Sequence, residues 1–244
     1  MAELIVKNVT LSYEQKPVIE DISIELHGNE LVCLLGASGG GKTSLFNVIS
    51  GLRLPDKGSV ILNGADITGQ PGNISYMLQK DLLLPYKTIE DNVAVPLLIK
   101  GEKKKTAREK VSRYFDEFGL EGTQKKYPYQ LSGGMCQRAA LLRTYMFSRD
   151  AALLDEPFSA LDTMTKGDMH RWYLKVMEEI HMSTLFITHD IDEAVLLSDR
   201  IYLLTGKPGR ITDEILIREK KPRRQDFPMS EEFRNYKRQI LARL

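Results

Sequence analysis

The chain has 244 residues, of which 42% are hydrophobic and 27% are charged, so it is long and apolar enough to bury the core of a globular domain. Its net charge of +1 argues against a dedicated nucleic-acid-binding protein, whose surface is broadly basic. Cys33 and Cys136 lack metal-ligand spacing, and apolar runs such as residues 93–99 are far shorter than the ~20 residues that span a bilayer. We therefore expect a globular protein of a reducing compartment that does not cross a membrane by itself.

Strand patterns of two kinds occur along the chain. Residues 4–13 and 18–26 alternate apolar and polar side chains, as half-buried antiparallel strands do. Residues 31–35, 151–154 and 184–188 are short apolar runs, which are typical of buried parallel strands. The order predicts a mostly parallel core sheet with an antiparallel N-terminal β-subdomain.

Helical patterns separate these strands. They cover residues 42–50, 88–100, 106–118 and 135–147. The first three end at Gly51, Gly101 and Gly119, where a C-terminal helix cap places glycine. The fold class is therefore α/β.

The helical patterns also indicate how the domain is organised. Residues from about 87 to 147 contain no strand pattern, so we interpret them as a helical subdomain inserted into a single domain of residues 1–244. Residues from about 207 to 244 form a C-terminal extension with a basic last part. We expect Phe233, Tyr236 and Ile240 of this extension to pack on the domain; the alternative is a basic tail lying on an anionic membrane surface.

A glycine-rich segment follows the strand pattern at residues 31–35. Residues 36–43 match G-x-x-x-x-G-K-[ST], between a strand and a helix, which is the context of a P-loop. Its backbone N–H groups and the helix N-terminus favour a phosphate chain, Lys42 would reach the β- and γ-phosphates, and Thr43 would bind Mg²⁺. The segment predicts a site for a nucleoside triphosphate, built from Gly36, Ala37, Ser38, Gly39, Gly40, Gly41, Lys42, Thr43 and Ser44.

Two adjacent carboxylates end the apolar run at residues 151–154. Asp155 is placed to hold the shell of Mg²⁺, as the aspartate at this strand end does in P-loop proteins. Glu156 is placed to polarise an attacking water. The pair favours hydrolysis over phosphoryl transfer to a small acceptor.

A serine and two glycines precede the helical pattern at residues 135–147. Ser132 offers a hydroxyl, Gly133 and Gly134 offer unobstructed N–H groups, and the helix N-terminus attracts an anion. Taken alone, this segment fits a helix cap that binds no ligand better than a ligand site.

Together, these segments resemble the ATP-binding subunit of an ABC transporter over nearly the whole chain. Residues 131–135, LSGGM, are similar to the family signature LSGGQ, with Met135 in place of glutamine. The resemblance implies that Ser132, Gly133 and Gly134 contact ATP held by the P-loop of a second subunit. Two copies would then enclose two nucleotides head to tail.

The resemblance also implies roles for four residues outside these segments. Tyr13 would stack on adenine, and Gln79 would contact Mg²⁺ and the attacking water. Asp162, in the segment SALD, would lie where the two subunits meet. His189 would sense the γ-phosphate and, with Glu156, position the water.

Three stretches indicate a subfamily. LSGGM, residues 83–97 and residues 205–211 resemble ATPases that drive uptake of nitrate, sulfonates and taurine, a group that also serves pyrimidine and thiamine-precursor importers. The resemblance implies a peripheral homodimer on the cytoplasmic face of the cell membrane. It would bind an integral-membrane permease through residues 79–95 and serve an extracytoplasmic solute-binding protein through that permease, with no nucleic-acid partner.

Two alternatives stay open at this point. Import and export ATPases share every residue named above, so an exporter subunit is one alternative. An ABC-type ATPase of a soluble machine is the other, although it would leave the importer-like stretches unexplained. The intact Lys42, Asp155, Glu156 and His189 argue against a non-catalytic binding subunit.

Overall fold

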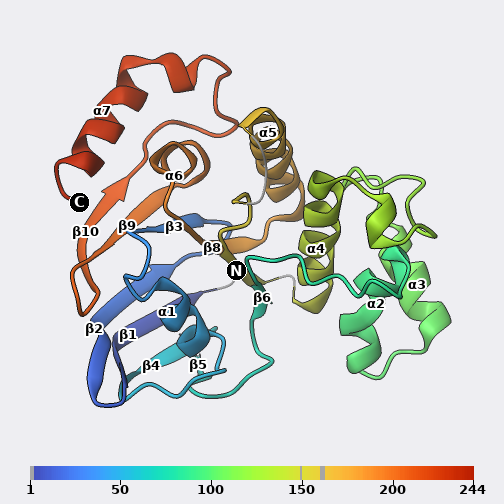
Figure 1. Cartoon of the computed structure of the whole chain (residues 1–244), viewed down its shortest axis with the longest axis horizontal. Coiled ribbons are helices and arrows are strands. Elements are labelled where there is room, and N and C mark those ends of the chain that lie inside the picture. The colour runs from blue at the N-terminus through green and yellow to red at the C-terminus, as the bar shows by residue number, and fades with distance from the viewer. Residues whose placement is uncertain (1–2, 149, 160–162) are drawn as a thin grey trace.

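The computed structural model describes residues 3–148, 150–159 and 163–244. Two sheets lie against each other at one end of the molecule, and helices extend from them toward the other end (Figure 1). The smaller sheet is antiparallel, with strand order β2-β1-β4-β5. Its strands are β1 (Leu4–Tyr13), β2 (Lys16–Leu26), β4 (Lys57–Leu62) and β5 (Ala65–Asp66).

The larger sheet has the strand order β10-β9-β3-β8-β7-β6, and it is parallel except for β10, which pairs antiparallel with β9. Its strands are β3 (Leu31–Leu35), β6 (Ser75–Met77), β7 (Ala151–Asp155), β8 (Ser183–Thr188), β9 (Arg200–Thr205) and β10 (Arg210–Leu216). Cys33 packs into the core on one face of β3 and Val32 into the core on the other. Burial on both faces explains why the central strands are unbroken apolar runs.

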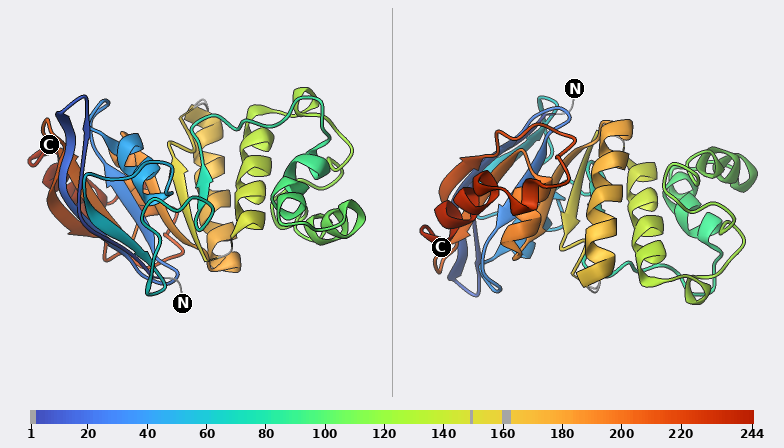
Figure 2. Two further views of the ribbon diagram at one scale, coloured as in Figure 1. Left: turned by 90° about the horizontal axis from the view of Figure 1, so that it is seen from below. Right: turned by 90° about the horizontal axis from the view of Figure 1, so that it is seen from above.

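Seven α-helices are present in the described ranges. They are α1 (Lys42–Ile49), α2 (Ile89–Ile99), α3 (Lys104–Ser112), α4 (Gly133–Phe147), α5 (Thr163–Ile180), α6 (Ile191–Leu197) and α7 (Glu231–Leu241). Figure 2 shows α4 beside α5, with α2 and α3 farthest from the sheets. Residues 87–147 hold α2, α3, α4 and a short 3-10 turn at Pro128–Gln130, with no strand among them. No helix in the described part of the chain combines the length and apolar character that a bilayer-spanning helix needs.

The architecture confirms the predicted α/β class and its antiparallel N-terminal sheet. Two details go beyond or differ from the expectation. The large sheet carries an antiparallel edge strand, β10, which no sequence pattern had indicated, while the N-terminal strands pair with β4 in a sheet of their own. The helix expected at residues 106–118 ends at Ser112, and the chain then turns so that Phe115 and Phe118 reach the core completely buried.

The C-terminal segment packs on the domain, as expected. Phe233 and Ile240 of α7 are buried, and the Tyr236 hydroxyl accepts a hydrogen bond of 3.0 Å from the backbone N–H of Arg218. Ser230 caps the helix by accepting from the Phe233 N–H.

Candidate active site

The predicted site lies along the side of the large sheet where its parallel strands end and loops begin. β3, β8, β7 and β6 are neighbours in the sheet and run parallel, so their carboxyl ends meet there. The glycine-rich loop follows β3, Glu156 follows β7, His189 follows β8 and Gln79 lies two residues beyond β6. Open α/β sheets bind ligands at such an edge.

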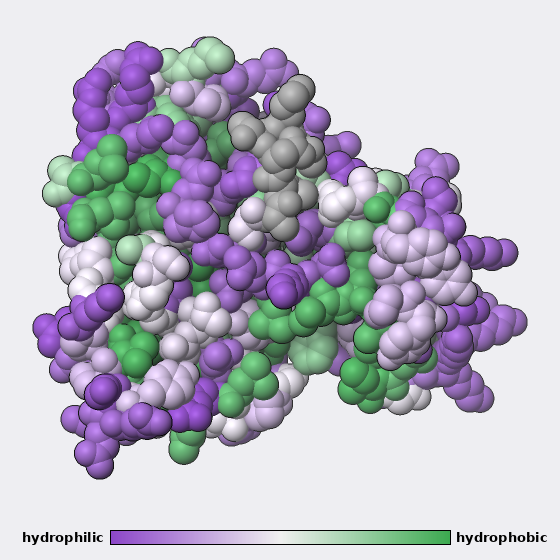
Figure 3. Space-filling model, viewed as in Figure 1, coloured by the Kyte–Doolittle hydropathy of each residue, from purple (hydrophilic) through white to green (hydrophobic). Residues whose placement is uncertain are grey.

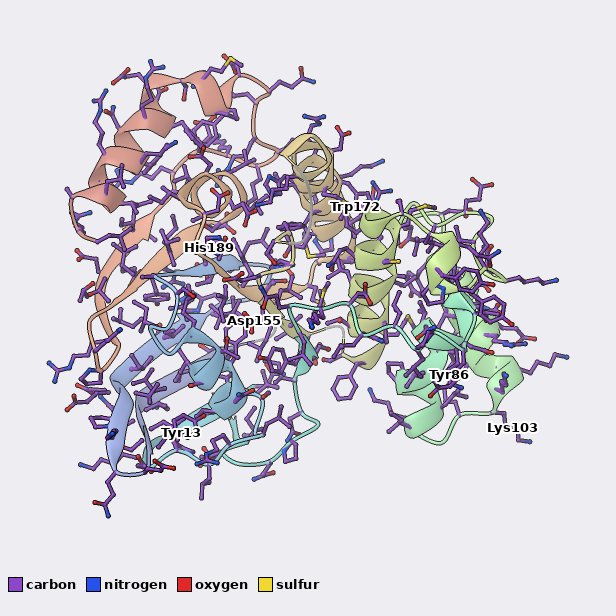
Figure 4. All side chains as sticks on the ribbon, viewed as in Figure 1. Tyr13, Tyr86, Lys103, Asp155, Trp172 and His189 are labelled. Atoms are coloured by element: carbon purple, nitrogen blue, oxygen red, sulfur yellow. The ribbon has the colours of Figure 1, made fainter. Side chains whose placement is uncertain are left out.

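An open cleft lies along this edge. Its walls are Val18, Ser38, Gly39, Gly41, Lys42, Thr43, Ser44, Gln79, Asp155, Glu156 and His189. Figure 4 places Asp155 and His189 near the middle of the molecule, where these strands end. The topology thus brings together eight residues that sequence reasoning named from the P-loop and acid segments, along with Gln79 and His189. Val18, at the second sheet's edge, has no sequence signal that would have singled it out.

The glycine-rich loop, residues 36–41, packs closely against β9 and β2. A side chain at Gly36 would place its Cβ 2.4 Å from the backbone oxygen of Leu204, and one at Gly41 would place it 2.5 Å from the Cγ2 of Ile19. Gly41 also has a φ of +92°, which favours glycine. Glycine is therefore required here by space and by backbone conformation, and the loop curves in front of the α1 N-terminus.

Lys42 is nearly completely buried under this loop. Its Nζ donates hydrogen bonds of 2.8 Å to the backbone oxygens of Gly36 and Ala37. Burial lowers the pKa of Lys42, against the opposing charges of Glu156 and Asp155. The ammonium group is held inside the curve of the loop, where a phosphate chain would meet it.

Asp155 lies opposite Lys42 at the end of β7 and is buried. Its Oδ2 accepts hydrogen bonds from the Thr43 hydroxyl at 3.1 Å and from the Tyr76 hydroxyl at 3.5 Å. Burial raises the pKa of Asp155, and the hydrogen bond from Thr43 acts in the opposite direction. A hydroxyl and a carboxylate side by side are the hard oxygen donors that Mg²⁺ prefers, so these residues fit that ion.

Glu156 is the meeting point of the cleft's polar side chains. Its Oε1 lies 3.0 Å from Nδ1 of His189, and its Oε2 accepts a hydrogen bond of 3.1 Å from Nε2 of Gln79. Its φ of +46° is uncommon for a residue with a side chain and costs about 1 kcal/mol or more. The backbone N–H of Glu156 donates to the Ile187 oxygen of β8, which helps to hold this turn. A carboxylate held at both oxygens is arranged to accept a proton from a bound water.

A buried charged cluster behind His189 was not anticipated from the sequence. Glu193 of α6 is 3% exposed and accepts a hydrogen bond of 2.7 Å from the hydroxyl of Thr188, the residue before His189. Lys166 and His170, both on α5, lie 3.0 and 3.5 Å from its Oε1. The only signal was the spacing of Asp190 and Glu193 at a helix start, which is typical of a capping pair.

We expect Glu193 to make the free energy of unfolding decrease as the pH is lowered into the acid range. Burial alone would raise its pKa, but the contacts with His170 and Lys166 and the hydrogen bond from Thr188 outweigh burial and lower the pKa to about 2, from 4.5. A folded-state pKa below the unfolded value gives stability that is complete above pH 4.5 and lost as pH falls toward 2. We expect urea unfolding to show Glu193→Gln less stable than wild type at pH 7, with the difference shrinking by about 2 kcal/mol by pH 3. A stability difference between variant and wild type that stays the same from pH 7 to pH 3 would contradict the lowered pKa. Glu178→Gln, at an exposed position of α5, is the control.

Some predicted site residues lie elsewhere. Tyr13 is not among the residues that line the cleft; its ring lies under the guanidinium of Arg53, 4.9 Å from the ring centroid, and apart from Asp155 in Figure 4. Ser132 and Gly133 are exposed at the α4 N-terminus, also outside the cleft, and Ser132 accepts from the Met135 N–H at 3.3 Å. Asp162 lies outside the described residues.

Comparison with known proteins agrees with the family resemblance noted from the sequence. Residues 19–159 match the family model described as ABC transporter. The formylaminopyrimidine import ATP-binding protein ThiZ of Halalkalibacterium halodurans is 45% identical over 203 residues, covering 83% of this chain and 79% of that protein. The taurine import ATP-binding protein TauB of Escherichia coli O157:H7 is 39% identical over 210 residues, covering 86% and 82%.

A solved structure shares the fold. It is the dimeric ATP-binding cassette MJ0796 in a post-hydrolysis state bound to ADP and Pi. The match has a TM-score of 0.74 at 27% sequence identity and covers 88% of this chain and 99% of that one.

Proposed function

Because the chain belongs to the family of ABC transporter ATP-binding proteins, we propose that it is the ATP-hydrolysing subunit of an importer of small solutes. The observation that carries the proposal is the cleft itself. A buried lysine, an oxygen-donor pair and a carboxylate held by a histidine and a glutamine converge at the ends of four neighbouring strands. This arrangement supports binding of ATP and attack of water on its terminal phosphate.

Each group in the cleft has a task in this mechanism. The loop N–H groups and Lys42 bind the β- and γ-phosphates and offset their charge. Thr43 and Asp155 would hold Mg²⁺, with Gln79 nearby, and the ion would supply further charge neutralisation when bound. Glu156 accepts the proton of the attacking water, and its contacts with Gln79 and His189 fix the direction in which the carboxylate points.

The second half of the site would come from another copy. Ser132, Gly133 and Gly134 face solvent or are half-buried at the α4 N-terminus, where their hydroxyl and N–H groups can receive a phosphate held by another copy. The dimeric state of MJ0796 bound to ADP and Pi supports this pairing. We propose a head-to-tail homodimer that closes on two nucleotides, with ATP favouring the closed state through contacts made only there.

The relatives support a class of transported solute. ThiZ and TauB are described as import proteins for formylaminopyrimidine and for taurine, so their similarity supports import of a small polar compound of the sulfonate, nitrate or pyrimidine type. An extracytoplasmic solute-binding protein would deliver it, and this subunit would act on the cytoplasmic face of the membrane.

A groove between the sheets and the helical part supports a permease contact. It is lined by Ser50, Leu52, Pro71, Gly72, Ile74, Tyr76, Pro96, Arg143, Thr144 and Phe147. Leu52 in the groove, and Leu78 and Leu82 in the chain that follows β6, expose 63%, 41% and 53% of their surface. Figure 3 shows hydrophobic side chains where the chain crosses toward the helical part. We propose that a cytoplasmic segment of the permease docks here.

A pull-down tests this function. The Glu156→Gln protein, tagged and held with ATP in native membranes, should co-purify with a polytopic membrane protein identified by mass spectrometry. The Lys42→Ala protein is the matched control, because it should not retain ATP and should recover less of the same partner. Recovery of soluble partners alone would contradict a transporter role.

A further inference from the structure

The chain between β6 and α2 passes from the cleft to the helical part of the molecule. We name residues 79–84 of this stretch the crossing segment. At one end, Nε2 of Gln79 donates to Glu156 at 3.1 Å and lies 3.4 Å from the Ser159 hydroxyl. Near the other end, Leu82 has a φ of +45°, a left-handed conformation that a leucine rarely adopts. Such a conformation persists only where surrounding contacts hold it.

Arg143 of α4 provides that hold. Its guanidinium donates a hydrogen bond of 2.9 Å to the backbone oxygen of Leu82 and a second, shorter one to the backbone oxygen of Asp81. The two acceptors are consecutive carbonyls, which match the fork of N–H groups that a guanidinium presents. A lysine could serve only one of them well.

A second residue of the helical part anchors the end of the crossing segment. Asn92 of α2 is completely buried; its Oδ1 accepts from the Leu84 N–H at 2.6 Å, and its Nδ2 donates to the Leu84 oxygen at 3.1 Å. Leu82 is therefore held by α4 and Leu84 by α2, and both helices belong to the helical part of the molecule rather than to the sheets. A shift of α4 relative to the sheets would therefore act directly on the crossing segment, which begins at Gln79.

Arg143 is also reachable from outside. It lines the groove described above, together with Tyr76 and Phe147, and it lies on α4, the helix that Ser132 caps. Arg143 thus belongs to the helix that starts at the Ser132 segment, lines the groove, and holds the crossing segment through its guanidinium.

We propose that Arg143 is a positioning residue for ATP hydrolysis, which sets the place of Gln79 by holding the carbonyls of Asp81 and Leu82. The proposal rests on the proposed ATPase function. Arg143 does not line the cleft in which nucleotide and the attacking water would bind. Its effect is on the population of molecules in which Gln79 reaches Glu156, so it should alter turnover more than nucleotide affinity.

The test compares Arg143→Ala, Arg143→Lys and wild type by ATP hydrolysis and by hydrogen exchange of residues 79–86. For Arg143→Ala we expect kcat to fall about tenfold with KM for ATP changed less than about twofold. Amide exchange of residues 83 and 84, whose N–H groups donate to Asp81 and Asn92, should accelerate about tenfold while the sheet stays protected. Arg143→Lys should restore part of both.

Lys100→Ala is the matched control, because Lys100 also donates from its side chain to a backbone oxygen, that of Phe147 at the end of α4, outside the crossing segment. It should leave kcat and exchange of residues 79–86 unchanged. Unchanged exchange in Arg143→Ala, or equal loss of kcat in Lys100→Ala, would overturn the proposal. If wild type itself hydrolyses no ATP, the proposed function fails, and the exchange data alone still decide whether Arg143 holds the crossing segment.

Discussion

Replacing Glu156 with glutamine is expected to lower steady-state ATP hydrolysis by about a hundredfold or more, while ATP binding is retained. The amide keeps the size of the side chain and can still contact Gln79 and His189, 3.1 and 3.0 Å away, but it cannot accept the proton of water. The expected product is a stable ATP-bound dimer, detectable by size-exclusion chromatography with and without ATP.

Exposed Glu178→Gln on α5 controls for the loss of one negative charge. Glutamate and glutamine have the same Cβ and so the same cost at a φ of +46°, and melting temperatures of the variant and wild type should be measured to confirm that the fold is kept. Hydrolysis within about threefold of wild type would show that another group accepts the proton.

Ser132→Arg is expected to abolish hydrolysis while leaving ATP binding by the cleft unchanged. Ser132 is exposed and does not line the cleft of its own chain, so the larger side chain cannot obstruct Lys42 or Thr43 directly. It would instead block the approach of a second copy to the phosphate and remove a hydroxyl donor. Loss of one such donor lowers turnover about a hundredfold.

The control is Ser230→Arg, which removes the same kind of helix cap from α7. Ser230 accepts from the Phe233 N–H at 3.1 Å, as Ser132 accepts from the Met135 N–H at 3.3 Å. Each cap contributes about 1 kcal/mol, so both variants should lose similar stability and only Ser132→Arg should lose turnover. Binding of a fluorescent ATP analogue and phosphate release measure the two effects separately.

Site residues could be predicted from the sequence where a short local pattern is enough to place them. The glycine-rich loop after β3 and the acid pair after β7 each combine a strand with residues that immediately follow it, so parallel pairing is enough to bring them together. The family and the α/β fold were predicted for the same reason. The β10 edge was not, because pairing of β10 with β9 depends on partners that its own half-exposed pattern does not specify.

Residues that act through distant partners were missed. Arg143 and Leu82 are 61 positions apart, and nothing in either local pattern indicates their contact. Nothing in the sequence around Glu193 indicates that its carboxylate contacts Thr188 and two side chains of α5. The adenine-stacking role that the resemblance implies for Tyr13 stays a prediction: the ring is partly exposed, lies under the guanidinium of Arg53 and does not line the cleft.

The measurement that tests the shared site most directly is ATP hydrolysis by a mixture of Lys42→Ala and Ser132→Arg proteins. Each variant alone should be inactive. In a mixed head-to-tail dimer, one site combines the intact Lys42 of one copy with the intact Ser132 of the other, so an equal mixture should recover about a quarter of wild-type activity. Recovery at that level would support a site built by two copies, whereas no activity above that of either variant alone would contradict it.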